Sequence, residues 1–219
     1  MSTDRRGAWL NPTSWLLAAA AWVLFVGVAL TAFVLVTPND ADAEDSFSDA
    51  FAATESVAWP AAFGPPTADW TCVVAVHPNC PCMGATLDAL EAAVASAPAA
   101  PRLIATVYRP SGADASFTDT PTVGRLGRSF DAWMFDDVNG TVGASLGAEL
   151  SGHVVVFDGD GIARFGGGLT PERGRGGANA GLDAVTTLLS GGKPEVGGFR
   201  VFGCPYVAPM DTCAVECER

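Results

Sequence analysis

The sequence predicts an α/β domain preceded by one transmembrane helix. Three observations indicate this arrangement. The stretch from Trp15 to Val36 contains no charged residue. The run from Thr71 to Val76 is short and continuously apolar, which is typical of a strand covered on both faces. Apolar residues then recur at helical spacing between Met83 and Ser96, so a strand followed by a helix is expected there.

The uncharged stretch, residues 15–36, would form a helix of roughly 33 Å, enough to cross the hydrocarbon core of a membrane. Arg5 and Arg6 precede it, and acidic residues follow it. Basic residues favour the cytoplasmic side. The sequence therefore predicts a cytoplasmic segment 1–14 and a single-pass protein of the cytoplasmic membrane with a periplasmic or extracytoplasmic C-terminal domain. A cleaved signal peptide is the competing interpretation.

The rest of the chain divides by composition. Residues 37–55 are acidic and rich in alanine, which is typical of a linker. A globular domain is expected over 56–203, and a cysteine-containing tail over 204–219. The formal net charge of −12 argues against nucleic acid as a partner, because nucleic-acid binding needs a basic face.

The order of elements within the domain is βαβ, then a helix, then ββα, with an insertion after the second strand. The insertion is expected to hold a short helix and a short strand. Asp158-Gly159-Asp160-Gly161 is a strong hairpin signal. The expected elements after the first strand and helix are a strand at 102–108, a helix at 123–130, a strand at 132–135, a helix at 140–146, a hairpin at 153–157 and 162–165, and a helix at 182–189.

The turn His77-Pro78-Asn79-Cys80-Pro81-Cys82 lies where the first strand ends and the helix begins. A helix N-terminus carries unpaired N–H groups and partial positive charge, which favour a thiolate. Cys80 is expected at the outer edge as the attacking thiol. Cys80 and Cys82 are close enough in sequence to form a strained, labile disulfide. This pattern predicts thiol–disulfide chemistry.

Two histidines, His77 and His153, are expected near this turn. A cationic His77 would stabilise a thiolate. As neutral rings, both could join Cys80 and Cys82 around a soft metal such as copper. The redox interpretation needs no cofactor, whereas the alternative is a copper-binding or copper-delivery protein. A non-catalytic structural domain is a further alternative.

The other cysteines have separate expected roles. Cys72 lies in the apolar run and is expected to be a buried thiol. Cys204 could fold back as a resolving thiol. Cys213 and Cys217 are spaced to pair with each other in the tail, although several connectivities remain open.

The order of elements and the cysteine turn together resemble the thioredoxin superfamily, including its membrane-tethered members. Four segments, spread over roughly residues 57–206, more narrowly resemble the RedB-type thioredoxin-like proteins of bacteria: the His77–Cys82 turn, Phe165-Gly166-Gly167-Gly168-Leu169-Thr170, Gly177-Ala178-Asn179-Ala180-Gly181 and Phe202-Gly203-Cys204-Pro205. The resemblance implies a bacterial envelope redox protein, whose partners would be protein thiols or disulfides there. It would be a possible thiol–disulfide oxidoreductase, with catalytic residues Cys80, Cys82, His77 and Pro81.

The sequence departs from ordinary thioredoxins at two places. Superposing Pro81 and Cys82 on the end of a Cys-Gly-Pro-Cys turn leaves Asn79 where the nucleophilic cysteine would be. Gly152, followed by His153, stands where thioredoxins carry a cis-proline. Asn79, Gly152, His153 and Cys204 are therefore expected to support the site. A peroxidase is disfavoured, because His77 occupies the position of the peroxiredoxin threonine.

Overall fold

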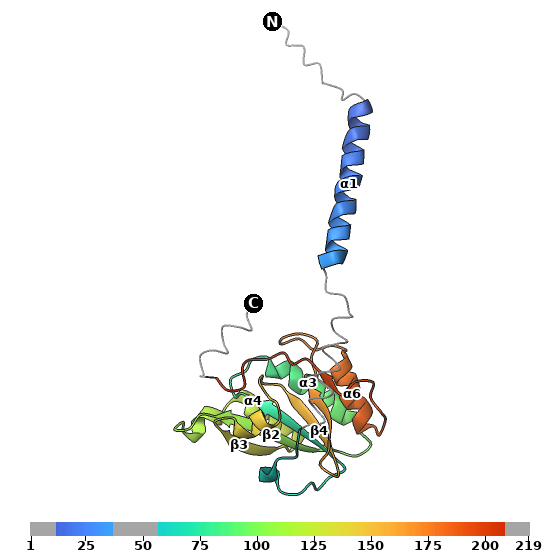
Figure 1. The fold of residues 1–219 in the computed structure, drawn as a ribbon. Coiled ribbons are helices and arrows are strands. Elements are labelled where there is room, and N and C mark those ends of the chain that lie inside the picture. Colours follow the sequence, from blue (N-terminus) through green and yellow to red (C-terminus); the bar gives the residue numbers. More distant parts are fainter. Residues whose placement is uncertain (1–11, 37–56, 209–219) are drawn as a thin grey trace. The chain divides into compact units, whose positions relative to one another are not determined.

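The computed structural model describes residues 12–36 and 57–208 (Figure 1). The chain divides into two compact units, Met1–Glu44 and Asp45–Arg219. The predicted linker, 37–55, lies outside the described residues. So does the predicted cysteine tail from residue 209 onward, with its proposed Cys213–Cys217 pair.

The predicted transmembrane helix requires a correction. A helix, α1, does run over Pro12–Val36. However, no helix in the described part of the chain is long and apolar enough to cross a membrane. The predicted fold class, a thioredoxin-like α/β domain preceded by a transmembrane helix, is therefore wrong in its transmembrane helix. The predicted localisation, a single-pass membrane protein with an extracytoplasmic domain, is wrong for the same reason.

The second unit is built on a mixed sheet of six strands in the order β3-β2-β1-β4-β5-β6 (Figure 1). β1 pairs in parallel with β2, which pairs in parallel with β3. On its other side β1 pairs antiparallel with β4, β4 pairs antiparallel with β5, and β5 pairs in parallel with β6. The strands are β1 (Trp70–Val76), β2 (Arg102–Arg109), β3 (Trp133–Val138), β4 (Val154–Asp158), β5 (Ala163–Gly167) and β6 (Gly198–Phe199).

Helices cover both faces of this sheet. The helices are α3 (Met83–Ala95), α4 (Pro121–Phe130), α5 (Thr141–Ser145) and α6 (Ala180–Leu189), with short 3-10 helices η1 (Ala61–Phe63) and η2 (Ala115–Thr118). Successive side chains of β1 point to opposite faces. Cys72 and Val74 pack with residues of α3, α4 and α6, whereas Val73 packs with residues of η1, β2 and β4. β1 is therefore buried on both faces, as its continuous apolar run predicted.

The insertion after β2 forms the edge of the sheet. Thr120 caps the N-terminus of α4 by accepting a hydrogen bond from the Val123 N–H, and Pro121 follows it. The strand predicted at 132–135 continues to Val138 because its two carboxylates have partners. Asp136 forms an ion pair with Arg109, and Asp137 accepts hydrogen bonds from backbone N–H groups at the start of α5.

A C-terminal segment, residues 203–208, packs against this scaffold. Tyr206 is fully buried, and its hydroxyl donates to Asp137 Oδ2 over 2.8 Å. Its ring lies directly against Gly143 of α5, where an added Cβ would overlap it. The Tyr206 N–H also donates to the Glu149 carbonyl over 2.8 Å. Tyr206 therefore anchors the segment two residues after Cys204.

We expect Gly143→Ala to lower the free energy of unfolding by about 1–3 kcal/mol, because the new methyl group would displace the buried Tyr206 ring. Gly84→Ala, in the helix α3, is the matched control. An added Cβ there meets nothing within 4 Å, so this change should be neutral or stabilising. Chemical denaturation of both variants checks the expectation. Equal stabilities of the two variants would contradict this account of the Tyr206 anchor.

Candidate functional site

Three cysteine sulfurs meet at the end of β1. The Sγ atoms of Cys80, Cys82 and Cys204 all lie within 4.8 Å of one another. The three residues are almost fully buried, with exposed fractions of 1%, 3% and 0%. We call these residues the cysteine cluster. Two of its members come from the turn after β1, and the third comes from the C-terminal segment, more than a hundred residues later in the chain.

The members of the cluster differ in oxidation state. Cys80 is a free thiol, whereas Cys82 is disulfide-bonded. The two cysteines of the turn are therefore not bonded to each other in this structure. A thiol thus lies close to a sulfur that already belongs to a disulfide.

Short-range hydrogen bonds shape the cysteine turn. The Cys80 N–H donates to the His77 carbonyl over 3.0 Å, and the Met83 N–H donates to the Cys80 carbonyl over 3.2 Å. The helix α3 begins at Met83 with Cys82 as its N-cap. Asn79 is half-buried, and Pro81 is exposed. The turn therefore exposes Pro81 and part of Asn79, while both of its cysteines stay buried.

His77 is a fully buried residue at the start of this turn. Its Nε2 donates to the Ala208 carbonyl over 3.1 Å, and its Nδ1 accepts from the Asn79 N–H at 3.3 Å. The ring stacks on Tyr108, with centroids 5.6 Å apart. Burial lowers the pKa of His77, although the bond to Ala208 opposes this. The imidazole is therefore neutral at pH 7 and fixes the turn by hydrogen bonding.

Ser151, a residue that the sequence did not single out, links the turn to the C-terminal segment. Its Oγ accepts from the His77 N–H over 2.9 Å, and its own N–H donates to the Cys204 carbonyl over 2.8 Å. Gly203 lies against the Ser151 carbonyl, so closely that a Cβ would overlap it. This close approach explains the glycine and brings Cys204 to the turn.

Gly152 and His153 extend the same strand connection. The Gly152 N–H donates to the Ala75 carbonyl, and the Ala75 N–H donates to the His153 carbonyl. Both residues therefore lie beside the end of β1, near the cysteine turn. Gly152 has a φ of 95°, a conformation that glycine adopts readily. His153 is half-buried, and desolvation lowers the pKa of its ring to about 4.

The insertion also contacts the turn. Thr120, which caps α4, donates its hydroxyl proton to the Pro78 carbonyl over 3.0 Å. The edge of the sheet thereby supports the segment that carries Cys80. Thr120 and Pro78 are 42 residues apart in the sequence. The residues around Thr120 therefore predict the capping of α4 but not the contact with the cysteine turn.

The structure brings some of the predicted site residues together and keeps others apart. Cys80, Cys82 and Cys204 come together. His77 and His153 lie next to the turn, but neither belongs to the group of potential metal ligands that the described residues bring together. Cys72 is fully buried on β1, and burial raises the pKa of its thiol to about 12. Cys80 is buried, and not at the outermost edge as expected.

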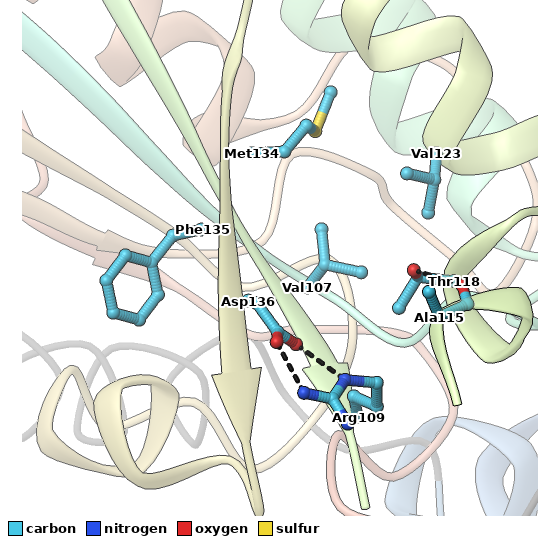
Figure 2. Close-up of a pocket in the computed structure, with 8 residues that line it drawn as sticks. All are labelled: Val107, Arg109, Ala115, Thr118, Val123, Met134, Phe135 and Asp136. Atoms are coloured by element: carbon cyan, nitrogen blue, oxygen red, sulfur yellow. Dashed lines mark hydrogen bonds and ion pairs between the residues drawn. The ribbon is translucent and has the colours of Figure 1, made fainter. Parts of the chain in front are cut away.

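A cavity of about 350 Å³ lies between the insertion and the edge strands. Figure 2 shows Val107, Val123 and Met134 around it, whereas Phe135 points away from them. The guanidinium of Arg109 forms two hydrogen bonds with the Asp136 carboxylate. The lining residues include none of the cysteines, so this cavity is separate from the cysteine cluster.

Comparison with known proteins supports a shared fold. No family model matches the chain, and no curated protein matches it. An uncharacterized conserved protein from Geobacillus kaustophilus has a similar structure with a TM-score of 0.50 at 18% identity, covering 66% of this chain and 80% of that chain. A hypothetical protein from Sinorhizobium meliloti 1021 matches with a TM-score of 0.48 at 14% identity, covering 64% of this chain and 80% of that one.

The lowered pKa of His153 predicts a pH dependence of stability. The unfolded ring titrates near its ordinary value of 6.5, whereas the folded ring titrates at about 4. As the pH falls through this window the unfolded state binds the proton first, so the free energy of unfolding decreases. Solvent around the half-buried ring reduces the effect, and we expect a loss of about 1–2 kcal/mol between pH 7 and pH 5.

Denaturant unfolding of the wild type and of His153→Gln at several pH values measures this contribution. The variant should lose less stability than the wild type between pH 7 and pH 5. Parallel stability curves for the two proteins would show that the His153 ring does not titrate as described.

Proposed function

We propose that the protein is a thiol–disulfide redox protein in which Cys80, Cys82 and Cys204 are the exchanging groups. One observation carries this proposal: the Cys80 thiol lies within 4.8 Å of the Sγ atom of Cys82, which is disulfide-bonded. Disulfides exchange when a thiolate attacks one of their sulfurs. The approach of Cys80 to Cys82 is therefore the arrangement that the first step of exchange requires.

The internal step is balanced in atoms and electrons. Cys80 loses its proton to solvent, and its thiolate attacks Cys82 Sγ. A Cys80–Cys82 bond forms, and the bond between Cys82 and its present partner breaks. The displaced sulfur leaves as a thiolate, which takes up a proton. No net oxidation occurs in this step, so the disulfide is only moved to the start of α3.

The overall reaction involves a partner with thiols or a disulfide. Two thiols of the partner reduce the protein's disulfide and become a disulfide themselves, while two protein thiols form. Run in reverse, the reduced protein receives a disulfide from the partner. Because Asn79 and Pro81 are more exposed than the cysteines beside them in the turn, we propose that a protein partner contacts the molecule there.

The position of the cluster adds support. The sulfurs of Cys80 and Cys82 lie at the N-terminal end of α3, where the helix dipole favours a thiolate. The succession β1, α3, β2 and later the β4–β5 hairpin and α6 is the succession on which the resemblance to the thioredoxin superfamily rests. We accordingly propose membership of that superfamily, with Cys82 at the second position of its usual cysteine pair, Asn79 at the first, and Cys80 and Cys204 as additional cysteines.

The burial of the cluster sets a condition on the reaction. The exposed fractions of the three residues do not exceed 3%, so an external thiol reaches them only when a covering segment moves. The C-terminal segment contributes Cys204 itself and is held by Ser151 and Tyr206. Exchange with a partner therefore requires a local displacement near this segment.

Exchange of the oxidised full chain with reduced glutathione tests the proposal. Samples are quenched with N-ethylmaleimide and mapped by mass spectrometry. In the wild type, a peptide that carries Cys80 and Cys82 with neither residue alkylated should accumulate during reduction. Cys80→Ser should exchange at least about tenfold more slowly, because the internal attack is lost.

Cys72→Ser is the matched control, since Cys72 is a buried thiol of the same core whose raised pKa disfavours reaction. It should exchange at the wild-type rate. A Cys80→Ser protein that also exchanged at the wild-type rate, with no Cys80–Cys82 bond detected at any time, would overturn the proposed relay.

A further inference from the structure

We infer that the fully reduced protein binds one soft monovalent metal ion, of the Cu(I) class, through the thiolates of Cys80, Cys82 and Cys204. The inference goes beyond the redox function, because it concerns the reduced protein alone and does not depend on the rate or direction of exchange. It rests on three Sγ atoms lying within 4.8 Å of one another, supplied by two segments of the chain.

The spacing of the sulfurs suits a three-coordinate ion. Metal–thiolate bonds are about 2.3 Å long, so a planar trigonal site holds its sulfurs roughly 4 Å apart. The observed spacing of up to 4.8 Å requires only small side-chain movements to reach this geometry. The turn and the C-terminal segment are already fixed to each other through Ser151, which limits the rearrangement needed.

The donor set selects the class of ion. Thiolates are soft ligands and favour Cu(I), Zn²⁺ and iron–sulfur clusters over Mg²⁺ or Ca²⁺. Structural zinc sites almost always take four protein ligands. The group of potential ligands in the described residues has three members, all cysteines, with no histidine or carboxylate among them. A group of three sulfurs among the described residues therefore favours Cu(I) over Zn²⁺.

The surroundings suit a dry, anionic thiolate complex. One monovalent ion with three thiolates carries two negative charges, and burial opposes such a charge. The N-terminal end of α3, where Cys82 is the N-cap, provides partial positive charge that offsets part of this cost. Near-complete burial of the three cysteines also keeps water and oxygen from the ion.

The reaction is balanced as follows. A reductant first supplies two electrons and two protons to the disulfide that contains Cys82, giving two thiols. Binding then releases one proton from each of the three cluster thiols as the ion binds. Oxidation back to the disulfide removes Cys82 as a ligand, so the oxidation state of the cluster controls whether the site exists.

Anaerobic titration of the reduced full chain with Cu(I) tests the inference, with bathocuproine disulfonate as the competing chelator. The protein is reduced with a phosphine, so that no added thiol competes for the metal. The wild type should bind one equivalent, and X-ray absorption should show three sulfur neighbours. Cys204→Ser and Cys80→Ser should each weaken binding at least tenfold.

Cys72→Ala serves as the control, because Cys72 lies in the same core but outside the cluster. It should bind as the wild type does. Circular dichroism shows whether each variant folds, and the two cluster variants give independent tests if one does not. Wild-type affinity in both Cys80→Ser and Cys204→Ser would overturn the inference, as would failure of the reduced wild type to compete with the chelator.

This outcome is independent of the redox proposal. A protein that exchanges disulfides through Cys80 but binds no Cu(I) would retain the redox function and lose the metal site. A protein that binds Cu(I) but shows no Cys80-dependent exchange would retain the metal site and lose the redox function.

Discussion

The two hydrogen bonds of Ser151 hold the site together. One fixes the backbone of His77 at the start of the cysteine turn, and the other fixes the backbone of Cys204. The turn and the C-terminal segment are far apart in the sequence, yet Ser151 bonds to both, and the His77 ring adds a direct bond to Ala208. Because Gly152 and His153, which follow Ser151, pair with Ala75 of β1, Ser151 is tied to the central strand of the sheet.

The local elements could be predicted from the sequence because each depends on nearby residues. The apolar run gave β1, helical spacing gave α3, and the Asp-Gly repeat gave the β4–β5 hairpin. β3 was predicted too short, because its acidic residues resemble a strand end. The structure shows that Asp136 and Asp137 have partners in Arg109 and in the start of α5, which an alternating pattern does not reveal.

The cysteine site could be predicted only in part. Residue types alone indicated the cysteine turn and a possible role for Cys204 as a resolving thiol. They did not indicate the burial of Cys80, because distant segments cover it. Ser151, Ala208 and Thr120 contact the turn from 74, 131 and 42 residues away in the sequence. The transmembrane prediction failed for a different reason. It relied on the absence of charge in residues 15–36, whereas no helix in the described part of the chain is long and apolar enough to cross a membrane.

The Tyr206 anchor makes Cys204 a tethered reactant. Its sulfur belongs to the same chain as Cys80 and Cys82, so the rate at which they meet does not depend on how dilute the protein is. If the segment were displaced, the short connection from Cys204 to Tyr206 would keep the thiol at a high effective concentration. Small molecules in solution would have to compete with that local concentration, which favours internal over external bond formation whenever the segment returns.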